Sequence, residues 1–156
     1  MGTGYTRRSG FELFGRGGRA LSEHWAKGIR TFHGFHVNGF PNCFVVSNMQ
    51  SVFSANFPHM LDEQAMHVDY VVKQCVEGQV RVIEAEAEDA WIETIRSLAI
   101  LRRSFLEECT PGYYNNEGKP QERSEQDGFY GAGPIAFVKL LEEWRANGDM
   151  KGLVRH

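Results

Sequence analysis

The chain has 156 residues, a net charge of −3 and 42% apolar residues. This length favours a single domain, and the composition favours a globular protein over a disordered one. The weak negative charge gives no footprint for nucleic acid or an anionic membrane, and no apolar run approaches the roughly 20 residues of a membrane helix. The first residues, rich in Gly, Thr and Arg, lack the apolar core of a signal peptide. Three widely spaced cysteines argue against a disulfide framework and for a cytoplasmic protein with reduced thiols.

The first thirty residues predict short extended pieces and turns. Residues 11–14 alternate apolar and charged side chains, which is typical of a strand, and the glycines of 15–18 predict a turn. Residues 20–26 predict either a return strand or a short helical turn, which Gly28 ends.

The same glycines fit the G-x-G-x-x-A pattern of a dinucleotide-binding fold. A true phosphate-binding turn is followed at once by a helix, with an acidic residue about 20 residues further on. Gly28 cuts such a helix short, and no Asp or Glu lies between Glu23 and Asp62. The sequence therefore favours a hairpin at this place.

The stretch 39–63 is the one around which the rest is organised. Pro41 and Asn42 favour a turn, and the three strand formers of 44–46 predict a short strand buried on both faces. Residues 31–39 predict an extended connector into that strand. A loop then leads to a helix, and in open α/β sheets ligands collect where strand ends meet helix N-termini.

Three helices are predicted. The first covers 57–76, with an inward face of residues at spacings of three and four, and Gly78 stops it. This predicted inward face consists of Met60, Leu61, Gln64, Ala65, Val68, Val71, Val72 and Cys75. The second helix covers 86–106, after a short extended piece at 80–83, and a loop follows at 110–128. The third begins at Pro134, where proline is tolerated, and ends before Gly148.

His59, Glu63 and His67 would share one face of the first helix. Imidazole and carboxylate groups in this arrangement allow a metal site. Because the spacing is not that of a His-Glu-x-x-His motif, a solvated or partly packed helix face is favoured instead.

Several motifs of this chain occur together in the C-terminal part of one enzyme family. The first is Gly-Phe-Pro-Asn-x-Phe at 39–44, followed by a short strand end and a helix that contains Glu-Gln. Four others follow the family's order: the glycines of 15–18 with Leu21 and Trp25, Gly-x-Arg-Thr-Phe-x-Gly at 28–34, Ala-Glu and Glu-x-x-Trp within 85–91, and Tyr-Tyr-Asn-Asn-x-Gly-Lys-Pro at 113–120. Linked motifs in one order across nearly the whole chain are far more specific than any one of them. The chain therefore resembles the C-terminal part of the Baeyer–Villiger monooxygenases.

The resemblance implies a flavoprotein that uses FAD, NADPH and dioxygen to insert oxygen into ketones through a peroxyflavin. The fold class it implies is a partial α/β structure: the C-terminal piece of a flavoprotein with two dinucleotide-binding domains, with short strands followed by about three helices. Residues 1–79 would be the C-terminal segment of the FAD-binding domain, and 80–156 a C-terminal helical and cover-loop segment. The phosphate-binding turns and the family's catalytic arginine would lie upstream of Met1.

The resemblance also implies site residues. Ser47 and Asn48 would bind the flavin, where the family usually has Gly-Pro, although an ordinary strand-to-helix turn is the alternative. Met60 would lie near the flavin or serve as a core methionine. Phe53 would line the substrate side or simply pack. Tyr113 would cover the nicotinamide cofactor on a loop, where the family prefers Trp, or would be a surface tyrosine. No catalytic or metal-binding residue is assigned within this chain.

Three functional hypotheses remain open at this point. In the first, the chain is part of a monooxygenase that acts on a small ketone or heteroatom substrate, and the chain alone is inactive. In the second, it is a subunit that completes a partner chain carrying the dinucleotide-binding folds. In the third, it is a truncated product without function. Because neighbouring strands would be absent, we expect an exposed apolar face along Phe32, Phe35, Phe44 and Val45.

Overall fold

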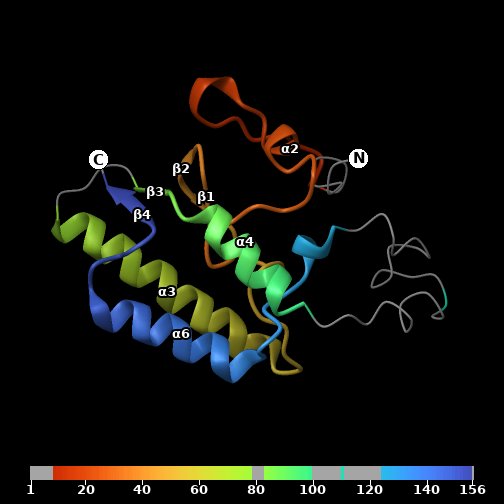
Figure 1. Cartoon of the computed structure of the whole chain (residues 1–156). Helices are drawn as coiled ribbons and strands as arrows, with labels where there is room; N and C mark the ends of the chain where they lie inside the picture. The colour runs from red at the N-terminus through yellow and green to blue at the C-terminus, as the bar shows by residue number, and fades with distance from the viewer. Residues whose placement is uncertain (1–8, 79–82, 100–109, 111–123, 156) are drawn as a thin grey trace.

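The computed structural model describes residues 9–78, 83–99, 110 and 124–155. The helices are η1 (Arg16–Gly18), α2 (Leu21–His24), α3 (Phe57–Glu77), α4 (Glu88–Ser97), η4 (Glu125–Asp127) and α6 (Pro134–Asn147), where η marks a 3₁₀ helix. The strands are β1 (His36–Val37), β2 (Phe40–Phe44), β3 (Ile83–Ala85) and β4 (Leu153–Arg155). Helices α3 and α6 run side by side, and the N-terminal loops lie at the opposite end of the molecule (Figure 1).

The N-terminal glycines form a hairpin, as expected. Phe14 pairs with Ala20, and the Leu21 amide donates to the Leu13 carbonyl over 2.9 Å. Residues 11–14 form only this single bridge rather than a strand, and α2 is one short helical turn. Gly28 has φ +121°, and a Cβ there would lie 2.7 Å from Cγ of Gln126. Only glycine fits this close approach without strain.

The prediction of a strand at 44–46, buried on both faces, is wrong. Strand β2 ends at Phe44 and pairs antiparallel with β1, and the Val46 side chain is 54% exposed. Between the pairs His36–Phe44 and Val37–Phe40 the register shifts, so residues 41–43 bulge out of the ladder. Proline has no N–H to donate to a ladder, and Asn42 takes φ +57°. The turn expected at Pro41 and Asn42 is therefore a bulge within the strand.

Residues 31–39 are not the extended connector that the sequence predicts. Phe32 bridges to His36 across a tight turn in which His33 has φ 54° and Gly34 has φ 81°. A second turn, at Asn38 and Gly39 with φ +80° at Gly39, then reverses the chain between β1 and β2, so that the two strands pair with each other.

The three longer helices form where the sequence predicts them. Helix α3 matches its predicted bounds to within one residue; the Asn56 side chain caps it by accepting from the His59 amide, and Gly78 follows its end. Helix α6 begins at Pro134 and is followed by Gly148 in the left-handed conformation. Helix α4 ends at Ser97, earlier than expected, and residues 100–106 of the predicted helix lie outside the described residues.

One apolar core joins the two halves of the chain. Its members come from the turn before β1, from the loops next to α3 and α6, and from α3, β3, α4, α6 and β4: Phe32, Phe35, Val52, Met60, Val71, Ala85, Trp91, Ile95, Phe137, Leu141, Met150 and Leu153. Strand β4 pairs with β3, which places the C-terminal strand beside the segment between α3 and α4. A smaller cluster under the N-terminal loops consists of Leu21, Trp25, Ile29, Val37 and Phe40.

The predicted exposed face is also wrong. Phe32 and Phe35 are only 7% and 0% exposed, because the C-terminal segment covers them. The ring centroids of Phe35 and of Phe137 on α6, for example, lie 6.5 Å apart. Phe44 and Val45 are half-buried. The large apolar side chains that are exposed include Val46 at the end of β2 and several on α3.

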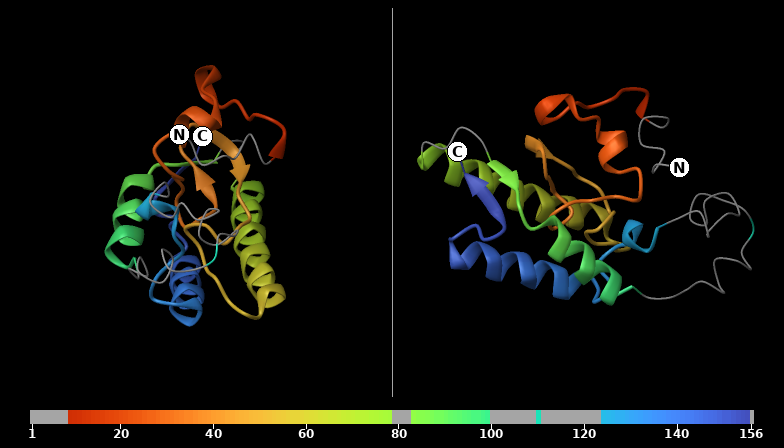
Figure 2. Two further views of the ribbon diagram at one scale, coloured as in Figure 1. Left: turned by 90° about the vertical axis from the view of Figure 1, so that its right-hand side faces the viewer. Right: turned by 45° about the horizontal axis from the view of Figure 1, so that its top comes forward.

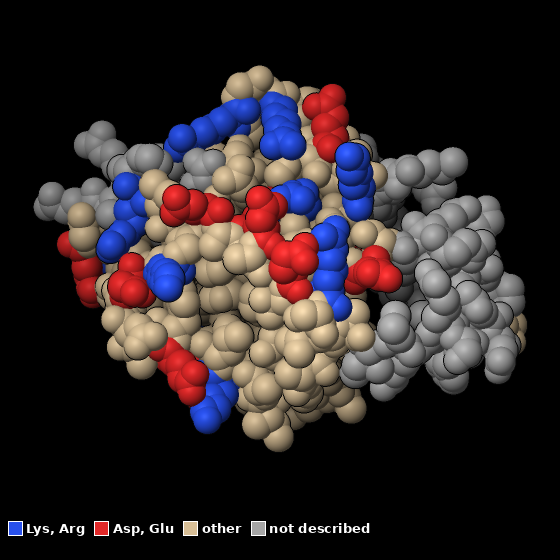
Figure 3. Space-filling view, in the orientation of Figure 1, with Lys and Arg blue, Asp and Glu red and all other residues tan. Residues whose placement is uncertain are grey.

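Acidic and basic side chains are intermixed on the face shown in Figure 3 and form no patch of one sign. None of the helices among the described residues is long and apolar enough to cross a bilayer.

Candidate functional site

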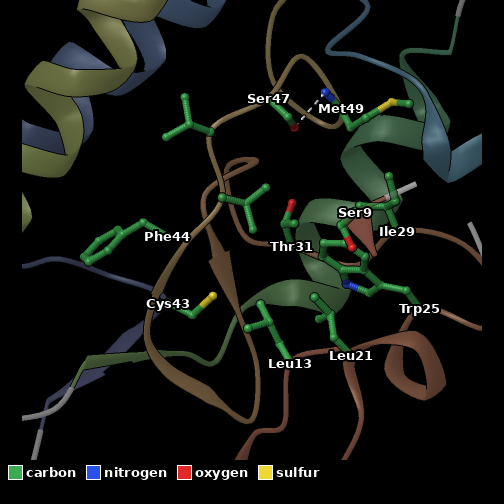
Figure 4. Close-up of a pocket in the computed structure, with 12 residues that line it drawn as sticks. Ser9, Leu13, Leu21, Trp25, Ile29, Thr31, Cys43, Phe44, Ser47 and Met49 are labelled. Carbon is green, nitrogen blue, oxygen red and sulfur yellow. Dashed lines mark hydrogen bonds between the residues drawn. The ribbon is translucent and has the colours of Figure 1, made fainter. Parts of the chain in front are cut away.

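A cavity of about 470 Å³ lies between the end of β2 and the N-terminal loops. Its lining is mostly apolar and consists of Ser9, Leu13, Leu21, Trp25, Ile29, Thr31, Cys43, Phe44, Val45, Val46, Ser47 and Met49. In Figure 4, Trp25, Ile29 and Thr31 lie across the cavity from β2, and the Cys43 sulfur points toward Leu13 and Leu21. Burial raises the pKa of the Cys43 thiol, which keeps it protonated and unreactive. The cavity suits a ligand that is largely apolar.

The segment after β2 is anchored at both ends but open in the middle. The Val45 amide donates to the Phe35 carbonyl over 2.7 Å, and the Met49 amide donates to the Ser47 hydroxyl over 3.2 Å. The Ser47 carbonyl accepts from Nε2 of Gln64 on α3 over 2.8 Å and from the Ser51 hydroxyl.

Between these anchors, the backbone amides of residues 46–48 and the Asn48 side chain make no hydrogen bond within the described part of the chain. Backbone amides left without protein partners are paired with water or with a ligand. The open segment therefore presents unused donors at the rim of the cavity.

Gln50 fixes the loop from beneath. Its side chain is fully buried and makes four hydrogen bonds: Oε1 accepts from the amide and the hydroxyl of Thr31, and Nε2 donates to the carbonyls of Ile29 and Gln126. Its carbonyl accepts from Nε1 of Trp91 over 3.0 Å. Because a primary amide can make about four such bonds, Gln50 is fully satisfied. It joins the cavity wall to α4 and η4.

Glu88, the first residue of α4, holds the opposite wall. The carboxylate is buried and accepts from Nε2 of His24 over 3.1 Å, from Nε of Arg30 over 3.3 Å and from the Asn38 amide over 2.6 Å. Arg30 also pairs with the exposed Asp89. Helix α2 contributes Leu21 to the cavity, so Glu88 positions that wall through His24.

Three histidines form a buried group on the inner side of α3, which we term the histidine cluster: His33, His36 and His67. The ring centroids of His36 and His67 lie 6.0 Å apart, and those of His33 and His67 lie 6.2 Å apart. Burial lowers the pKa of His36 to about 4, and burial together with His36 lowers that of His33 to about 3. Burial, followed by the neighbouring His36, His33 and Arg145, lowers the pKa of His67 to about 2. All three rings are therefore neutral near pH 7.

The histidine cluster corrects the expected faces of α3. His67 is fully buried rather than solvated, and Glu63 is buried too, whereas Leu61 and Val72 point outward. The described residues contain no group of three or more His, Cys, Asp and Glu placed to hold a metal ion.

The sequence-predicted site residues lie in different places. Ser47 lines the cavity, and Asn48 stands next to it, half-buried. Met60 is 3% exposed within the main core. Phe53 is 45% exposed and stacks on Phe129 with ring centroids 5.7 Å apart. Tyr113 lies outside the described residues.

Three residues that shape this site carry little signal in the sequence. Gln50 belongs to none of the motifs, and it stands among the mostly polar residues of 47–51, so nothing local marks it as a buried hydrogen-bond centre. Thr31 occurs within the Gly-x-Arg-Thr pattern, which does not indicate its contact with Gln50. Glu88 was part of a quoted motif, but its partners His24 and Asn38 are far away in sequence and carried no signal.

The chain was compared with known proteins, and no family model matches it. It is 47% identical to neopentalenolactone D synthase of Streptomyces avermitilis over 98% of this chain and 26% of that protein. An FAD-binding monooxygenase of Hypomyces subiculosus is 36% identical over 98% of the chain and 26% of its own length. A Baeyer–Villiger monooxygenase of Stachybotrys chlorohalonatus is 34% identical over 97% of the chain and 25% of its own length.

Solved structures agree with these relatives. A polycyclic ketone monooxygenase from Thermothelomyces thermophila superimposes with a TM-score of 0.86 and 36% identity, over 97% of this chain and 25% of that one. The chain is homologous to the C-terminal portion of Baeyer–Villiger-type flavin monooxygenases. A steroid monooxygenase bound to NADP superimposes with a TM-score of 0.73 and 25% identity, over 92% of this chain and 26% of that one.

The chain thus spans about a quarter of the length of the curated relatives that it matches. The expected fold class, a partial α/β piece with short strands and about three longer helices, is confirmed. The cofactors that the resemblance implies, FAD and NADP, agree with these proteins: one relative is an FAD-binding monooxygenase by name, and one solved steroid monooxygenase is bound to NADP.

The residues present fit one edge of a flavin. An apolar cavity suits the faces of a tricyclic aromatic ring, and the unused amides of 46–48 suit the ring's polar edge. Phosphate-binding turns are not found among the described residues, because the glycines of 15–18 form a hairpin.

Proposed function

We propose that this chain is the C-terminal part of an FAD- and NADPH-dependent Baeyer–Villiger-type monooxygenase, which inserts oxygen into a small ketone or oxidises a heteroatom. The observation that carries the proposal is the similarity to such monooxygenases over 98% of the chain. When bound, reduced flavin supplies the activation of dioxygen, and the protein supplies binding, orientation and exclusion of water.

In this proposal the open segment 46–48 meets the polar edge of the flavin. Ser47 is held in place by Gln64 and Ser51, so its backbone is already positioned for the ring. Asn48 adds a side-chain amide that no described residue uses. Such prearranged donors bind a ligand without a further ordering cost.

The remaining site assignments are proposed on the same basis. Phe53 is 45% exposed and stacks on Phe129, and we place these two rings on the substrate side of the site. Tyr113 would cover the nicotinamide cofactor. Met60 would contribute to the flavin environment through the core beneath the loop. Residues 1–79 would belong to the FAD-binding domain and 80–156 to the C-terminal cover, although the main core draws on both.

The dinucleotide-binding folds would come from upstream sequence of the same protein or from a partner chain. We propose that this chain alone holds FAD poorly and is inactive, because phosphate-binding turns are not found among its described residues. The free thiols of Cys43 and Cys75 fit a cytoplasmic location.

Flavin retention tests this proposal. The chain is purified alone and together with the part of neopentalenolactone D synthase that lies N-terminal to the matched region, each in the presence of FAD. The account expects a colourless protein alone and a yellow complex with bound FAD when both parts are present. A chain that retains FAD unaided, or a pair that never associates and never holds FAD, would contradict it.

A further inference from the structure

Helix α3 has three distinct faces rather than two. One face packs onto the core of this chain and consists of Met60, Glu63, Gln64, His67 and Val71. Three of these five side chains are polar, which is unusual for the inward face of a helix. The left view of Figure 2 shows α3 at one edge of the molecule, with α6 on its inner side.

A second face is apolar, and most of it faces outward; Val68, near its middle, is half-buried against the main core. The members of this face recur at spacings of three and four, and we term them the apolar stripe: Phe57, Leu61, Ala65, Val68, Val72 and Val76. At about 1.5 Å per residue the stripe is about 28 Å long. Phe57, Val72 and Val76 are 50%, 43% and 73% exposed. The stripe contains no charged or polar residue along its length.

The third face is the one suited to water. It carries Asp62, Asp69, Lys73 and Glu77, and the ammonium of Lys73 lies 2.7 Å from the carboxylate of Asp69. Met66, 49% exposed, is the one large apolar side chain on this side. A helix covered on one side only would carry charges over the rest of its surface. Two apolar or buried faces and one charged face indicate a helix that is covered from two sides. This chain covers the first face with its own core and leaves the apolar stripe uncovered.

We propose that the apolar stripe is the surface on which the dinucleotide-binding part of the complete monooxygenase packs. The inference rests on the proposed function and adds the place of contact. The chain spans only 26% of its relative neopentalenolactone D synthase, so most of such a protein lies outside it. A stripe without charge matches an apolar sheet or helix face and disfavours a charged partner surface, whose charges would lose water and find no partner.

The position of α3 supports this occupant over others. Gln64 on α3 donates to the Ser47 carbonyl, so the helix is fastened to the segment that would meet the flavin. Val46, at the rim of the cavity, is 54% exposed. A dinucleotide-binding part that packs on the stripe would therefore lie beside the end of β2. There it would close the cavity and cover the exposed side of α3 at the same time.

The test compares two lysine substitutions on one helix. Val72→Lys places a charge in the apolar stripe, and Met66→Lys is the matched control on the charged face. Both positions are about half exposed, so both variants of the chain should keep the wild-type thermal unfolding midpoint. Affinity is measured by titration of each chain against the FAD-loaded N-terminal part of neopentalenolactone D synthase.

The proposal predicts that Val72→Lys weakens this association by about a hundredfold, because an unpaired charge would be buried, and that Met66→Lys leaves it within about threefold of wild type. Equal affinities for the two variants would overturn the assigned surface while leaving the proposed function intact. A wild-type chain that does not associate at all would overturn both. A wild-type homodimer that Val72→Lys dissociates, with association to the N-terminal part unchanged, would assign the stripe to a second copy and overturn the proposal.

Discussion

The substitution Gln50→Leu should strongly destabilise the chain. It keeps the approximate size of the side chain but removes four buried hydrogen bonds, of 3.0 and 2.6 Å to Thr31, 2.7 Å to the Ile29 carbonyl and 2.9 Å to the Gln126 carbonyl. The Ile29 carbonyl keeps a bond from Gln126 Nε2. The Thr31 amide and the Gln126 carbonyl lose their side-chain partner inside the protein.

The expected magnitude follows from these two groups. Each buried group left without a partner costs about 1–3 kcal/mol, so the free energy of unfolding should fall by about 4 kcal/mol. The Thr31 hydroxyl can rotate toward another acceptor, so it adds little. A loss of this size is a large share of the stability of an ordinary domain.

Equilibrium unfolding in urea, followed by tryptophan fluorescence, measures the effect; Trp91 donates to the Gln50 carbonyl and so reports on this place directly. The matched control is Gln74→Leu near the end of α3. Among the described residues its side chain makes one hydrogen bond, of 3.4 Å to Glu77, so the substitution should change stability by less than about 0.5 kcal/mol. If Gln50→Leu does not fold, Thr31→Val removes only the hydroxyl bond and should cost about 1 kcal/mol. A Gln50→Leu protein as stable as the control would refute the reasoning.

Three further predictions concern stability. The three rings of the histidine cluster have folded-state pKa values below 6.5, so as the pH falls the unfolded chain takes up protons before the folded one. The free energy of unfolding should therefore be at its full value above about pH 6.5 and should fall toward pH 4 by about 1.4 kcal/mol per pH unit for each histidine. Urea unfolding midpoints between pH 7 and pH 4.5 measure this, and midpoints that do not change with pH would contradict it. Gly34→Ala should lower the unfolding free energy by about 2 kcal/mol or more, because φ is +81° and the new Cβ would lie 2.6 Å from Cβ of Ser51; an unchanged melting temperature would count against it. Glu88→Ala should lower the free energy of unfolding by about 3 kcal/mol, because His24 and the Asn38 amide lose their buried hydrogen-bond partner. The control Glu93→Ala removes an exposed carboxylate and should lower it by less than about 0.5 kcal/mol. Similar melting temperatures for the two variants would show that the Glu88 contacts contribute little.

The helices were predictable because local signals define them. Pro134 and Gly148 bracket α6, and Asn56 and Gly78 bracket α3, through capping and backbone preferences that act within a few residues. The same holds for the glycine hairpin, where the absence of an acidic residue between Glu23 and Asp62 separated a turn from a phosphate-binding loop.

The strand region was mispredicted because its outcome depends on distant contacts. Three strand formers at 44–46 gave the right propensity, but pairing with β1 ended the strand at Phe44. Likewise Phe32 and Phe35 were expected to be exposed, since nothing local shows that α6 and β4 return to cover them.

The candidate site was predictable only in part. The motif at 39–44 located the cavity rim, and Ser47 does line it. The Gln50 and Glu88 networks join residues separated by up to 76 positions, which periodicity and spacing do not detect.

A chimera tests the central claim most directly. The matched region of neopentalenolactone D synthase is replaced by this chain, and NADPH oxidation with a ketone substrate of that enzyme is followed alongside the flavin absorbance. The account predicts a yellow protein whose NADPH oxidation depends on the ketone, whereas the same enzyme ending before the matched region shows neither. A folded chimera that lacks FAD and does not oxidise NADPH would contradict the assignment of this chain to such a monooxygenase.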